Sequence, residues 1–434
     1  MTFMSHFFGS TVPFAEPLWY SRSVNPRFKD SHRRLRESVR NYVDAEILPF
    51  CTQWEADGRI PDRVLKRHAA LGYAAAVMSP SQMGEHINVP LPGDISPQEW
   101  DGFHDLIVTD EIARCGSLGV LWALGCGTAI TGPILVEYGT EEQKARFLPQ
   151  VINGESRLCL GITEPEVGSD IGNLVTHAKQ QDGCFIVNGT KKWVTNGTFA
   201  NYCIAAVRTG EGGRNGISLL NIPLDSVGIS REKIECSGVA SGGTASIVFD
   251  NVRVPCENLI GKENRGFYML MSSFDHHRLW IAANCLRLAR VCLEDAYQHA
   301  LTRHTFGKPL IDRQTIRLKL ANLGLQITSS YALLESLTEM RQDLSANAGQ
   351  THGGIGALCA MVKVSAARAF ELAVHESQQI MGALAYTRSG AGLRVERLSR
   401  DMRVLVIGGG SDEILSEMSV MQEQKDLNKC KVLP

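Results

Sequence analysis

The sequence predicts an α+β protein with several domains: a helical N-terminal part, a central antiparallel β-barrel or sandwich, and a C-terminal four-helix bundle. Apolar residues recur at helical spacing before Gly154 and again after Gly266. Between Leu158 and Pro255, short strand-like runs alternate with turn residues. A chain of 434 residues also exceeds what one hydrophobic core usually organises. The predicted segments are an arm (1–29), a helical domain (30–157), a β domain (158–265), a bundle (266–425) and a tail (426–434).

The N-terminal third begins with an aperiodic stretch rich in Pro, Ser and aromatic residues up to Pro26. We expect this arm to pack across other elements instead of forming a domain. A helix should follow, with Ser31 capping its start and Pro49 ending it. Farther along, Thr140 and Gln143 have the spacing of a capping box, which predicts another helix start.

The middle of the chain is predicted to be a strand domain. Asn188-Gly189 is typical of a type I′ hairpin, here between strands that carry Val187 on one side and Trp193 and Thr195 on the other. No helical crossover separates the strands, so the sheet should be antiparallel. The further predicted strands are Tyr202 to Val207, Ile217 to Ile222, and Ser246 to Val254.

The last part should be a helical bundle. Its clearest apolar stripe repeats at spacings of four and three residues, which is typical of bundle packing. The two glycine-rich runs, Gly353-Gly354 and Gly408-Gly409-Gly410, are expected to be loops. The residues of the stripe are Ile316, Leu320, Leu323, Ile327, Ser330, Leu334 and Leu337.

Composition excludes several classes of partner and location. A net charge of -2, with basic and acidic residues interspersed, argues against nucleic acid or an anionic membrane as partner. No stretch is expected to insert into a membrane, and no secretory or peroxisomal signal is recognisable. The twelve cysteines are scattered singly, which predicts reduced thiols and a cytoplasmic location, with an organelle matrix as the open alternative. No zinc-ligand spacing is present, so no metal is expected.

The run from Leu160 to Asp170, LGITEPEVGSD, is the first candidate for chemistry. It supplies the hydroxyls of Thr163 and Ser169 beside small glycines and a proline-stiffened turn. Such a loop can approach a flat polar ring closely. The alternative is a capped turn that only joins the helical and β domains. Neither a GxGxxG, a Walker A nor an HExxH motif competes with this interpretation.

Five motifs in one order resemble those of the acyl-CoA dehydrogenase family. GITEPEVGSD resembles the first signature of that family, and KKWVTNG, FDNVRVPCENLIG, RHTFGKPL and LSRDMRVLVIGGGSDEI follow in the family's order. The resemblance covers nearly the whole chain, and the extended N-terminal arm resembles a branch common in fungi. It implies the acyl-CoA dehydrogenase fold and an FAD-dependent oxidoreductase.

The resemblance also implies a cofactor site made of two groups of residues. Flavin contacts are implied for Leu160, Ile162 and Thr163 on one face of the ring and for Trp193 and Thr195 on the other, with Ser169, Ser411 and Glu413 nearby. Contacts to the FAD of a neighbouring subunit are implied for Arg303, Thr305, Phe306, Gln314, Gln379 and Gly382. Shared FAD sites imply an obligate oligomer, a homotetramer or a dimer. The chain departs from the family at Gly382-Ala383-Leu384-Ala385, where a second Gly and then Asn-Gly are usual.

Without that context, the same residues have plainer interpretations. Trp193 is then a hairpin core residue, Thr195 a strand threonine and Arg303 a solvated charge at a helix end.

The family reaction removes an α proton from an acyl thioester with a glutamate base while the β hydrogen leaves as hydride to the flavin. The implied partners are an acyl substrate on CoA or a carrier, and an electron acceptor. Substrate contacts are implied for Ser169, Asp275 and Arg278. The two positions at which relatives carry the glutamate are Gly409 and His277 in this chain.

Three explanations of the missing glutamate stay open. In the first, His277 is the base, because an imidazole with an ordinary pKa of ~6.5 can accept a proton at neutral pH. In the second, the enzyme is a flavin-dependent oxidase or monooxygenase of a specialised metabolite. In the third, Asp275 or Glu413 is the base, although a partner for Arg278 and a charge at a helix N-terminus are the roles favoured for them. A noncatalytic flavin-binding protein is the alternative outside enzymes.

Overall fold

The structure is a computed structural model that describes residues 8–21, 25–346 and 355–430. The chain divides into two compact units, and each unit combines segments that are distant in the sequence. The division falls inside the long helix α9 (Gly266–Thr302). The first unit contains Met1–Leu48, Asp101–Ser117 and Arg278–Pro434; the second contains Pro49–Trp100 and Leu118–His277.

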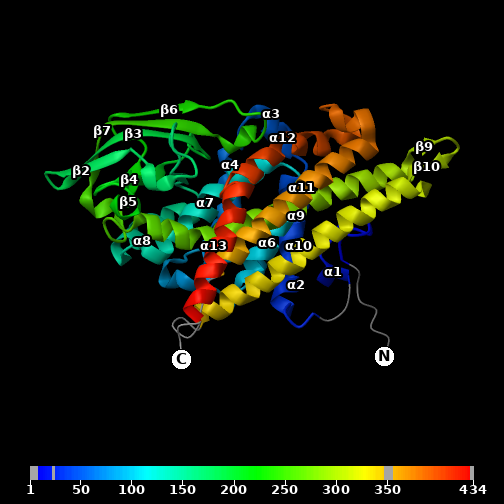
Figure 1. Cartoon of the computed structure of the whole chain (residues 1–434), viewed down its shortest axis with the longest axis horizontal. Helices are drawn as coiled ribbons and strands as arrows, with labels where there is room; N and C mark the ends of the chain where they lie inside the picture. Colours follow the sequence, from blue (N-terminus) through cyan, green and yellow to red (C-terminus); the bar gives the residue numbers. More distant parts are fainter. Residues whose placement is uncertain (1–7, 22–24, 347–354, 431–434) are drawn as a thin grey trace. The chain divides into compact units, whose positions relative to one another are not determined.

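Helices dominate the first unit, and its C-terminal helices run from green (α9) to red (α13) in Figure 1. A two-stranded hairpin, β9 (His304–Thr305) and β10 (Lys308–Pro309), follows α9. The other helices of this unit are α1 (Leu18–Ser21), α2 (Asp30–Tyr42) with a π-helical continuation (Val43–Ile47), α6 (Gly102–Ala113), α10 (Gln314–Ala346), α11 (Gly356–Met381), α12 (Leu393–Ile407) and α13 (Asp412–Cys430), with short 3-10 turns at Leu310–Asp312, Gly382–Tyr386 and Gly390–Gly392.

The helical bundle predicted from the apolar stripe is confirmed. On α10 the stripe residues from Leu320 to Leu337 are buried, while Ile316 is half-buried at the start of the helix. Helix α11 packs against α10, α12 and α13. One face of α10 is therefore buried, because every third or fourth residue on it is apolar except Ser330.

The described part of the N-terminal arm packs across this unit, as predicted. The Trp19 ring stacks on Phe28 with a centroid distance of 4.0 Å, and both are buried. Tyr20 Oη donates a 2.6 Å hydrogen bond to Glu111 of α6. Glu16 forms ion pairs with Arg40 (2.9 Å) of α2 and Arg287 of α9. The arm is thus held by aromatic packing and by buried charge pairs.

One helix of the second unit reaches the length and apolar character of a membrane span, which was not expected from the sequence. Helix α7 (Leu118–Tyr138) is long and apolar enough to cross a membrane, but 83% of its most apolar window is buried in the protein, which is typical of a core helix. Helix α8 (Glu141–Ile152) begins with the predicted capping box of Thr140 and Gln143. The remaining helices are α3 (Cys51–Asp57), α4 (Asp62–Ala70) and α5 (Tyr73–Ala76), with 3-10 turns at Pro80–Gln82, Gly84–His86, Pro92–Asp94, Ile171–Asn173, Arg214–Gly216, Ala240–Gly242 and Cys256–Asn258.

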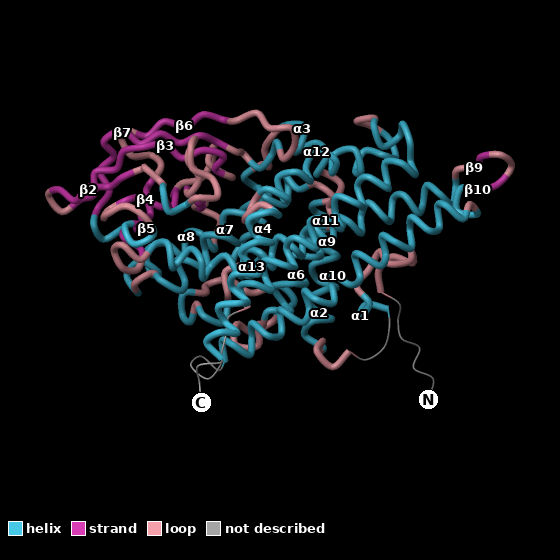
Figure 2. Tube along the Cα trace, viewed as in Figure 1, coloured by secondary structure: helices cyan, strands magenta, loops and turns pink. Residues whose placement is uncertain are grey.

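The central β domain is one eight-stranded sheet, drawn in magenta in Figure 2. Its strand order is β6-β7-β3-β2-β4-β5-β8, and β1 pairs with β4. The expected antiparallel pairing holds for most neighbours, but β1 and β2 both run parallel to β4. The strands are β1 (Leu158–Gly161), β2 (His177–Gln181), β3 (Cys184–Val194), β4 (Tyr202–Arg208), β5 (Ile217–Pro223), β6 (Ile229–Lys233), β7 (Ala245–Pro255) and β8 (Leu259–Ile260).

The predicted hairpin at Asn188-Gly189 is wrong. Strand β3 runs straight through these residues, and a register shift against β7 lies beside them. The real turn is Asp182-Gly183, where both residues have positive φ (49° and 73°) and connect β2 to β3 as a type I′ turn requires. Position 189 needs a glycine for a different reason: a side chain has no room there, because a Cβ would lie 2.5 Å from Thr176 Oγ1. Thr195 follows β3 in a turn and is not a strand residue.

Two helix ends also differ from the expectation. Lys29 and not Ser31 is the N-cap of α2, and Ser31 lies buried in the first turn. Helix α13 extends to Cys430, so the tail predicted from residue 426 begins inside a helix. The Gly408–Gly410 run is a loop, as predicted, whereas Gly353-Gly354 lies outside the described residues.

Candidate functional site

The loop after β1 makes a tight turn. Glu164 and Val167 close the turn through two backbone hydrogen bonds of 2.9 and 3.2 Å across Pro165-Glu166. Leu160, Ile162 and Thr163 lie just before the turn and are half-buried. The sequence interpretation of this run as a proline-stiffened turn is therefore confirmed.

A buried ion pair fixes this loop from below. Lys191 of β3 donates to Glu164 Oε1 at 2.8 Å and to the Ile162 carbonyl at 3.0 Å. Burial acts to raise the pKa of the Glu164 carboxyl, but the Lys191 ammonium and hydrogen bonds from Thr176 and Val175 outweigh it and hold that pKa below its usual value. The sequence reasoning missed Lys191 and Glu164, although both lie inside the motifs that it singled out.

Trp193 and Thr195 are brought beside the same loop. The Lys192 backbone N–H donates to the Thr163 carbonyl at 2.9 Å, which places the end of β3 against the loop. Trp193 has a left-handed backbone (φ 55°) and a side chain that is 50% exposed. An indole exposed on strained backbone is an unusual surface for a protein to present to water, and it indicates a surface for a ligand.

Asn196 is a hub that the sequence reasoning also missed. Its Nδ2 donates to the carbonyls of Trp122 and Gly242, and its Oδ1 accepts the Gly127 N–H at 3.0 Å. This buried amide joins the turn after β3 to α7 and to the loop before β7. The signal was available in the KKWVTNG motif, but only three-dimensional contacts reveal which residue of the motif holds the turn.

The residues of this region fit a flavin ring. Among the described residues, the hydroxyls of Thr163, Ser169 and Thr195 have no hydrogen-bonding partner, so they can bind polar ring atoms. No atom lies within 4 Å of a Cβ built on Gly168, so the loop has open space in front of it. Leu160, Ile162 and Thr163 on the loop and Trp193 and Thr195 beside it would hold such a ring.

The second predicted group, Arg303, Thr305 and Phe306, lies on the β9–β10 hairpin of the first unit. Phe306 and Gly307 have positive φ values (48° and 75°), so they form the turn. The Phe306 side chain is 97% exposed, and Arg313 supports the turn by donating to the Thr305 carbonyl at 2.6 Å. An exposed phenylalanine beside the exposed Arg303 suits a flat, anionic partner such as an adenine diphosphate.

The other predicted contacts of this unit lie on separate elements. Gln314 begins α10, Gln379 lies near the end of α11, and both are exposed. Gly382 follows α11 with a positive φ (62°), and the neighbouring Gln378 donates to the Ala385 carbonyl at 3.1 Å. This bond supports the loop that departs from the family pattern.

Helix α9 carries the predicted substrate residues and the predicted base. Asp275 and His277 are half-buried, and the His277 ring lies 6.1 Å from that of Phe274. Arg278 is buried and its Nη2 lies 3.8 Å from Met418 Sδ of α13. His277 thus combines an apolar ring neighbour with partial access to water.

The loop at the second base position holds no carboxylate. Gly409 has a positive φ (70°) in the turn between α12 and α13. Buried Lys363 donates to the Val406 and Gly410 carbonyls at 2.6 and 2.8 Å and so fixes both ends of the turn. Glu413 is exposed in the first turn of α13, and its backbone N–H and Ser411 lower its pKa. Glu413 has the geometry of a helix N-terminal charge.

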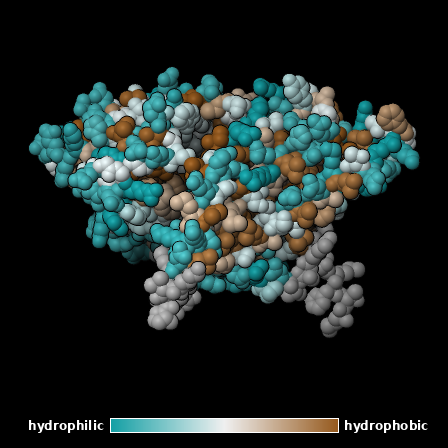
Figure 3. Space-filling view, in the orientation of Figure 1, coloured by the Kyte–Doolittle hydropathy of each residue, from teal (hydrophilic) through white to brown (hydrophobic). Residues whose placement is uncertain are grey.

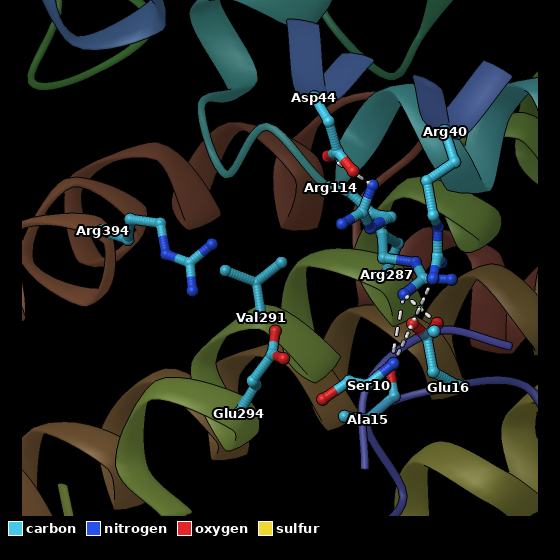
Figure 4. Close-up of a pocket in the computed structure, with 11 residues that line it drawn as sticks. Ser10, Ala15, Glu16, Arg40, Asp44, Arg114, Arg287, Val291, Glu294 and Arg394 are labelled. Atoms are coloured by element: carbon cyan, nitrogen blue, oxygen red, sulfur yellow. Dashed lines mark hydrogen bonds and ion pairs between the residues drawn. The ribbon is translucent and has the colours of Figure 1, made fainter. Parts of the chain in front are cut away.

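A separate polar pocket of about 350 Å³ lies in the first unit, between the arm, α2, α9 and α12 (Figure 4). Most of its charges are paired, including Arg114 with Asp44 and Arg40 with Glu16. Arg394 likewise pairs with Asp295. None of the predicted site residues lines this pocket, and its paired charges leave little net attraction for an anionic cofactor.

His32, Asp101 and His104 form the one cluster among the described residues that has metal-ligand geometry. Lys29 N–H donates to His32 Nδ1, so the ring proton lies on Nε2 and reaches Asp101 Oδ1 at 2.9 Å. Asp101 Oδ1 also accepts from the backbone of α6. The lone pairs that a metal would need are in use, so this cluster caps helices α2 and α6.

Comparison with known proteins adds three family models and several relatives. The acyl-CoA dehydrogenase N-terminal domain matches residues 29–155, the middle domain 159–252 and the C-terminal domain 264–423. An acyl-CoA dehydrogenase of Alternaria alternata, AFT10-1, is 80% identical over 99% of this chain and 100% of its own length. The acyl-CoA dehydrogenase apdG of Emericella nidulans is 35% identical over 98% and 99%.

Solved structures agree with these matches. A probable acyl-CoA dehydrogenase from Mycobacterium abscessus is 32% identical, with a TM-score of 0.82 over 92% of this chain and 100% of its own. A glutaryl-coenzyme A dehydrogenase bound to glutaryl-CoA is 27% identical, with a TM-score of 0.79 over 93% and 97%.

Proposed function

Because this chain belongs to the acyl-CoA dehydrogenase family, a family of FAD-dependent oxidoreductases acting on CH–CH groups, we propose that it desaturates an acyl thioester between the α and β carbons. The observation that carries the proposal is the junction of the β1 loop with the end of β3. There, the exposed indole of Trp193 lies beside the half-buried Thr163 and Thr195, whose hydroxyls have no partner among the described residues.

In the proposed enzyme, the β1 loop and Trp193 hold the flavin ring, and the β9–β10 hairpin holds the adenine end of an FAD of a neighbouring subunit. When bound, FAD supplies a two-electron acceptor for the β hydrogen. The chain's own task is to hold the acyl group and to remove the α proton. The side chain of Phe306, which is 97% exposed, supports the hairpin's role, because a large apolar side chain gains stability when a ligand or another subunit covers it.

We propose that His277 is the base that accepts the α proton of the substrate. Gly409 offers no acceptor, and Glu413 is a helix N-terminal charge. His277 occupies one of the two positions where relatives carry the base, and it is half-buried beside an aromatic ring. A neutral imidazole can take the α proton without a shifted pKa. Arg278 and Asp275 on the same helix are proposed to contact the substrate.

A flavin-dependent oxidase or monooxygenase of a specialised metabolite is the second candidate. The observation that favours it is the pair Gly409 and His277, which leaves both family base positions without a carboxylate. In a monooxygenase, a separate electron donor reduces the flavin before oxygen reacts with it, so no strong base is needed at these positions.

Anaerobic mixing of the FAD-loaded protein with acyl-CoA thioesters tests the proposal. Bleaching of the flavin absorbance without oxygen, together with turnover in air that consumes little oxygen, is expected for a dehydrogenase. Product formation that requires and consumes oxygen stoichiometrically would instead establish the second candidate. His277→Ala should abolish bleaching while FAD stays bound, and His277→Glu should restore it. Unchanged bleaching in His277→Ala would remove the base assignment, and His276→Ala, altering the adjacent buried histidine, is the control.

We also propose a homotetramer or dimer with shared FAD sites, an acyl substrate carried on CoA or a carrier, and a separate electron acceptor. Figure 3 shows apolar side chains interspersed among polar ones over α10, α11 and α13. Leu318, Leu325, Met361 and Met421 on these helices are each at least half exposed, which supports burial by another subunit. Light scattering of the FAD-loaded protein would give the subunit number.

A further inference from the structure

We propose that Lys191 is a positioning residue for the flavin: its ammonium fixes the β1 loop so that the Thr163 N–H faces the ring, and its charge raises the flavin reduction potential. The inference rests on the proposed binding of FAD at this loop. The Lys191 side chain is fully buried under the loop, so it would act through Ile162, Thr163 and Glu164.

The burial of Lys191 is the first step. The side chains of Lys191 and Glu164 are 0% and 1% exposed. Burying two charges usually costs more than their attraction returns, and an apolar pair of the same volume is often as stable. A buried pair under a functional loop is therefore better explained by the geometry that it imposes than by stability.

Peptide geometry gives the second step. The Ile162 carbonyl points down to Lys191 Nζ at 3.0 Å. Because a trans peptide directs its C=O and N–H to opposite sides, the N–H of Thr163 must point away from β3. The Thr163 carbonyl in turn points back to β3, where it accepts the Lys192 N–H. Thr163 is left with an outward N–H donor beside its hydroxyl.

The partner of Lys191 completes the arrangement. Glu164 accepts backbone hydrogen bonds from Val175 at 2.6 Å and Thr176 at 2.9 Å. The Lys191–Glu164 pair therefore joins three chain segments: the β1 loop, the residues just before β2 and the last third of β3. Removal of its charge would leave the Glu164 carboxylate uncompensated in a water-poor site, where its field is weakly screened.

These contacts predict opposite effects of two substitutions. Lys191→Met keeps the length of the side chain but leaves a negative charge under the flavin, so the reduction potential should fall. Glu164→Gln keeps an acceptor for Val175 or Thr176 but leaves a positive charge, so the potential should rise. A role limited to folding stability would not give shifts of opposite sign.

The experiment compares the FAD-loaded native protein with Lys191→Met, Glu164→Gln and the control Lys179→Met, which alters an exposed lysine of β2 in the same sheet. Flavin potentials are measured at equilibrium with redox dyes, and FAD affinity by fluorescence titration. We expect FAD to bind at least about tenfold more weakly to Lys191→Met, as loss of a charged hydrogen bond implies. Hydrogen exchange of residues 162–168 in the FAD-free protein should be faster in Lys191→Met than in the control.

Native affinity together with an unchanged potential in Lys191→Met would overturn the inference, as would shifts of the same sign in both variants. If Lys191→Met does not fold, the reduction potential of Glu164→Gln decides the test. A potential that does not rise in Glu164→Gln would overturn the proposed electrostatic effect of Lys191. A native protein that takes up no FAD would instead contradict the proposed function itself.

Discussion

Glu16 Oε2 accepts a 2.8 Å hydrogen bond from Nη1 of Arg287, which ties the N-terminal arm to helix α9. Arg40 holds the other oxygen of the same carboxylate at 2.9 Å. Burial acts to raise the pKa of Glu16, but the two guanidinium groups outweigh it and lower this pKa to about 2. The arm therefore carries a charge that stabilises the fold only while it is ionised.

Glu16→Gln should destabilise the protein at neutral pH by about 3 kcal/mol, the value of a pKa lowered from 4.5 to about 2. Because the folded-state pKa is the lower one, this stability is fully present above pH 4.5 and is lost as the pH falls towards 2. Denaturation midpoints of native protein and variant should thus converge in acid. A constant difference from pH 7 to pH 2.5 would contradict this account.

Asn196→Asp should weaken the second unit by about 2 to 4 kcal/mol. The substitution keeps the oxygen that accepts the Gly127 N–H but turns a donor of two hydrogen bonds into an acceptor facing the Trp122 and Gly242 carbonyls. Aspartate tolerates the positive φ of 64° at this position, so backbone strain does not contribute. The matched control is Asn215→Asp, whose exposed oxygen still accepts the Tyr268 hydroxyl. Equal urea midpoints for both variants would show that the hydrogen bonds of Asn196 do not stabilise the second unit.

Lys363→Met should loosen the turn around Gly409. The buried carbonyl of Val406 and the partly buried carbonyl of Gly410 lose their donor, which we expect to cost about 2 to 4 kcal/mol. Urea denaturation would measure the loss, with Lys425→Met on the exposed face of α13 as the control. Hydrogen exchange of residues 408–411 should rise only in Lys363→Met. Protection equal to that of the native protein would show that other contacts hold the turn.

Gly183→Ala tests the corrected hairpin. No atom lies within 4 Å of a Cβ at this position, so the φ of 73° is the only source of strain. We expect a destabilisation of about 1 to 2 kcal/mol. Gly212→Ala, where a Cβ also meets open space and φ is not left-handed, should be nearly neutral. A neutral Gly183→Ala would argue against the type I′ turn.

Local rules predicted those parts of the fold that depend on near neighbours. The capping box of Thr140 and Gln143 was predictable because its two hydrogen bonds join residues three positions apart. The stripe along α10 was predictable because helix period alone decides which residues share a face. The prediction that Thr163 and Trp193 lie in one site came instead from the family resemblance, and the hydrogen bond from the Lys192 N–H to the Thr163 carbonyl brings their two segments together.

Long-range contacts decided the features that were missed. Asn188-Gly189 has the composition of a turn, but pairing with β7 draws these residues into a straight strand, and the weaker signal Asp182-Gly183 forms the turn instead. The roles of Lys191 and Asn196 depend on partners 27 to 74 positions away. No local pattern marks one lysine or one asparagine as buried.

The ion pair between Glu16 and Arg287 also has a consequence for synthesis on the ribosome. Its two partners are separated by 271 positions, so at roughly 5 to 20 residues per second the arm emerges about 15 to 55 s before its partner does. The partners of Trp19 and Tyr20, Phe28 and Glu111, emerge much earlier. During synthesis the aromatic contacts of the arm can therefore form long before the buried ion pair of Glu16 with Arg287, which is among the last contacts of the arm to be completed.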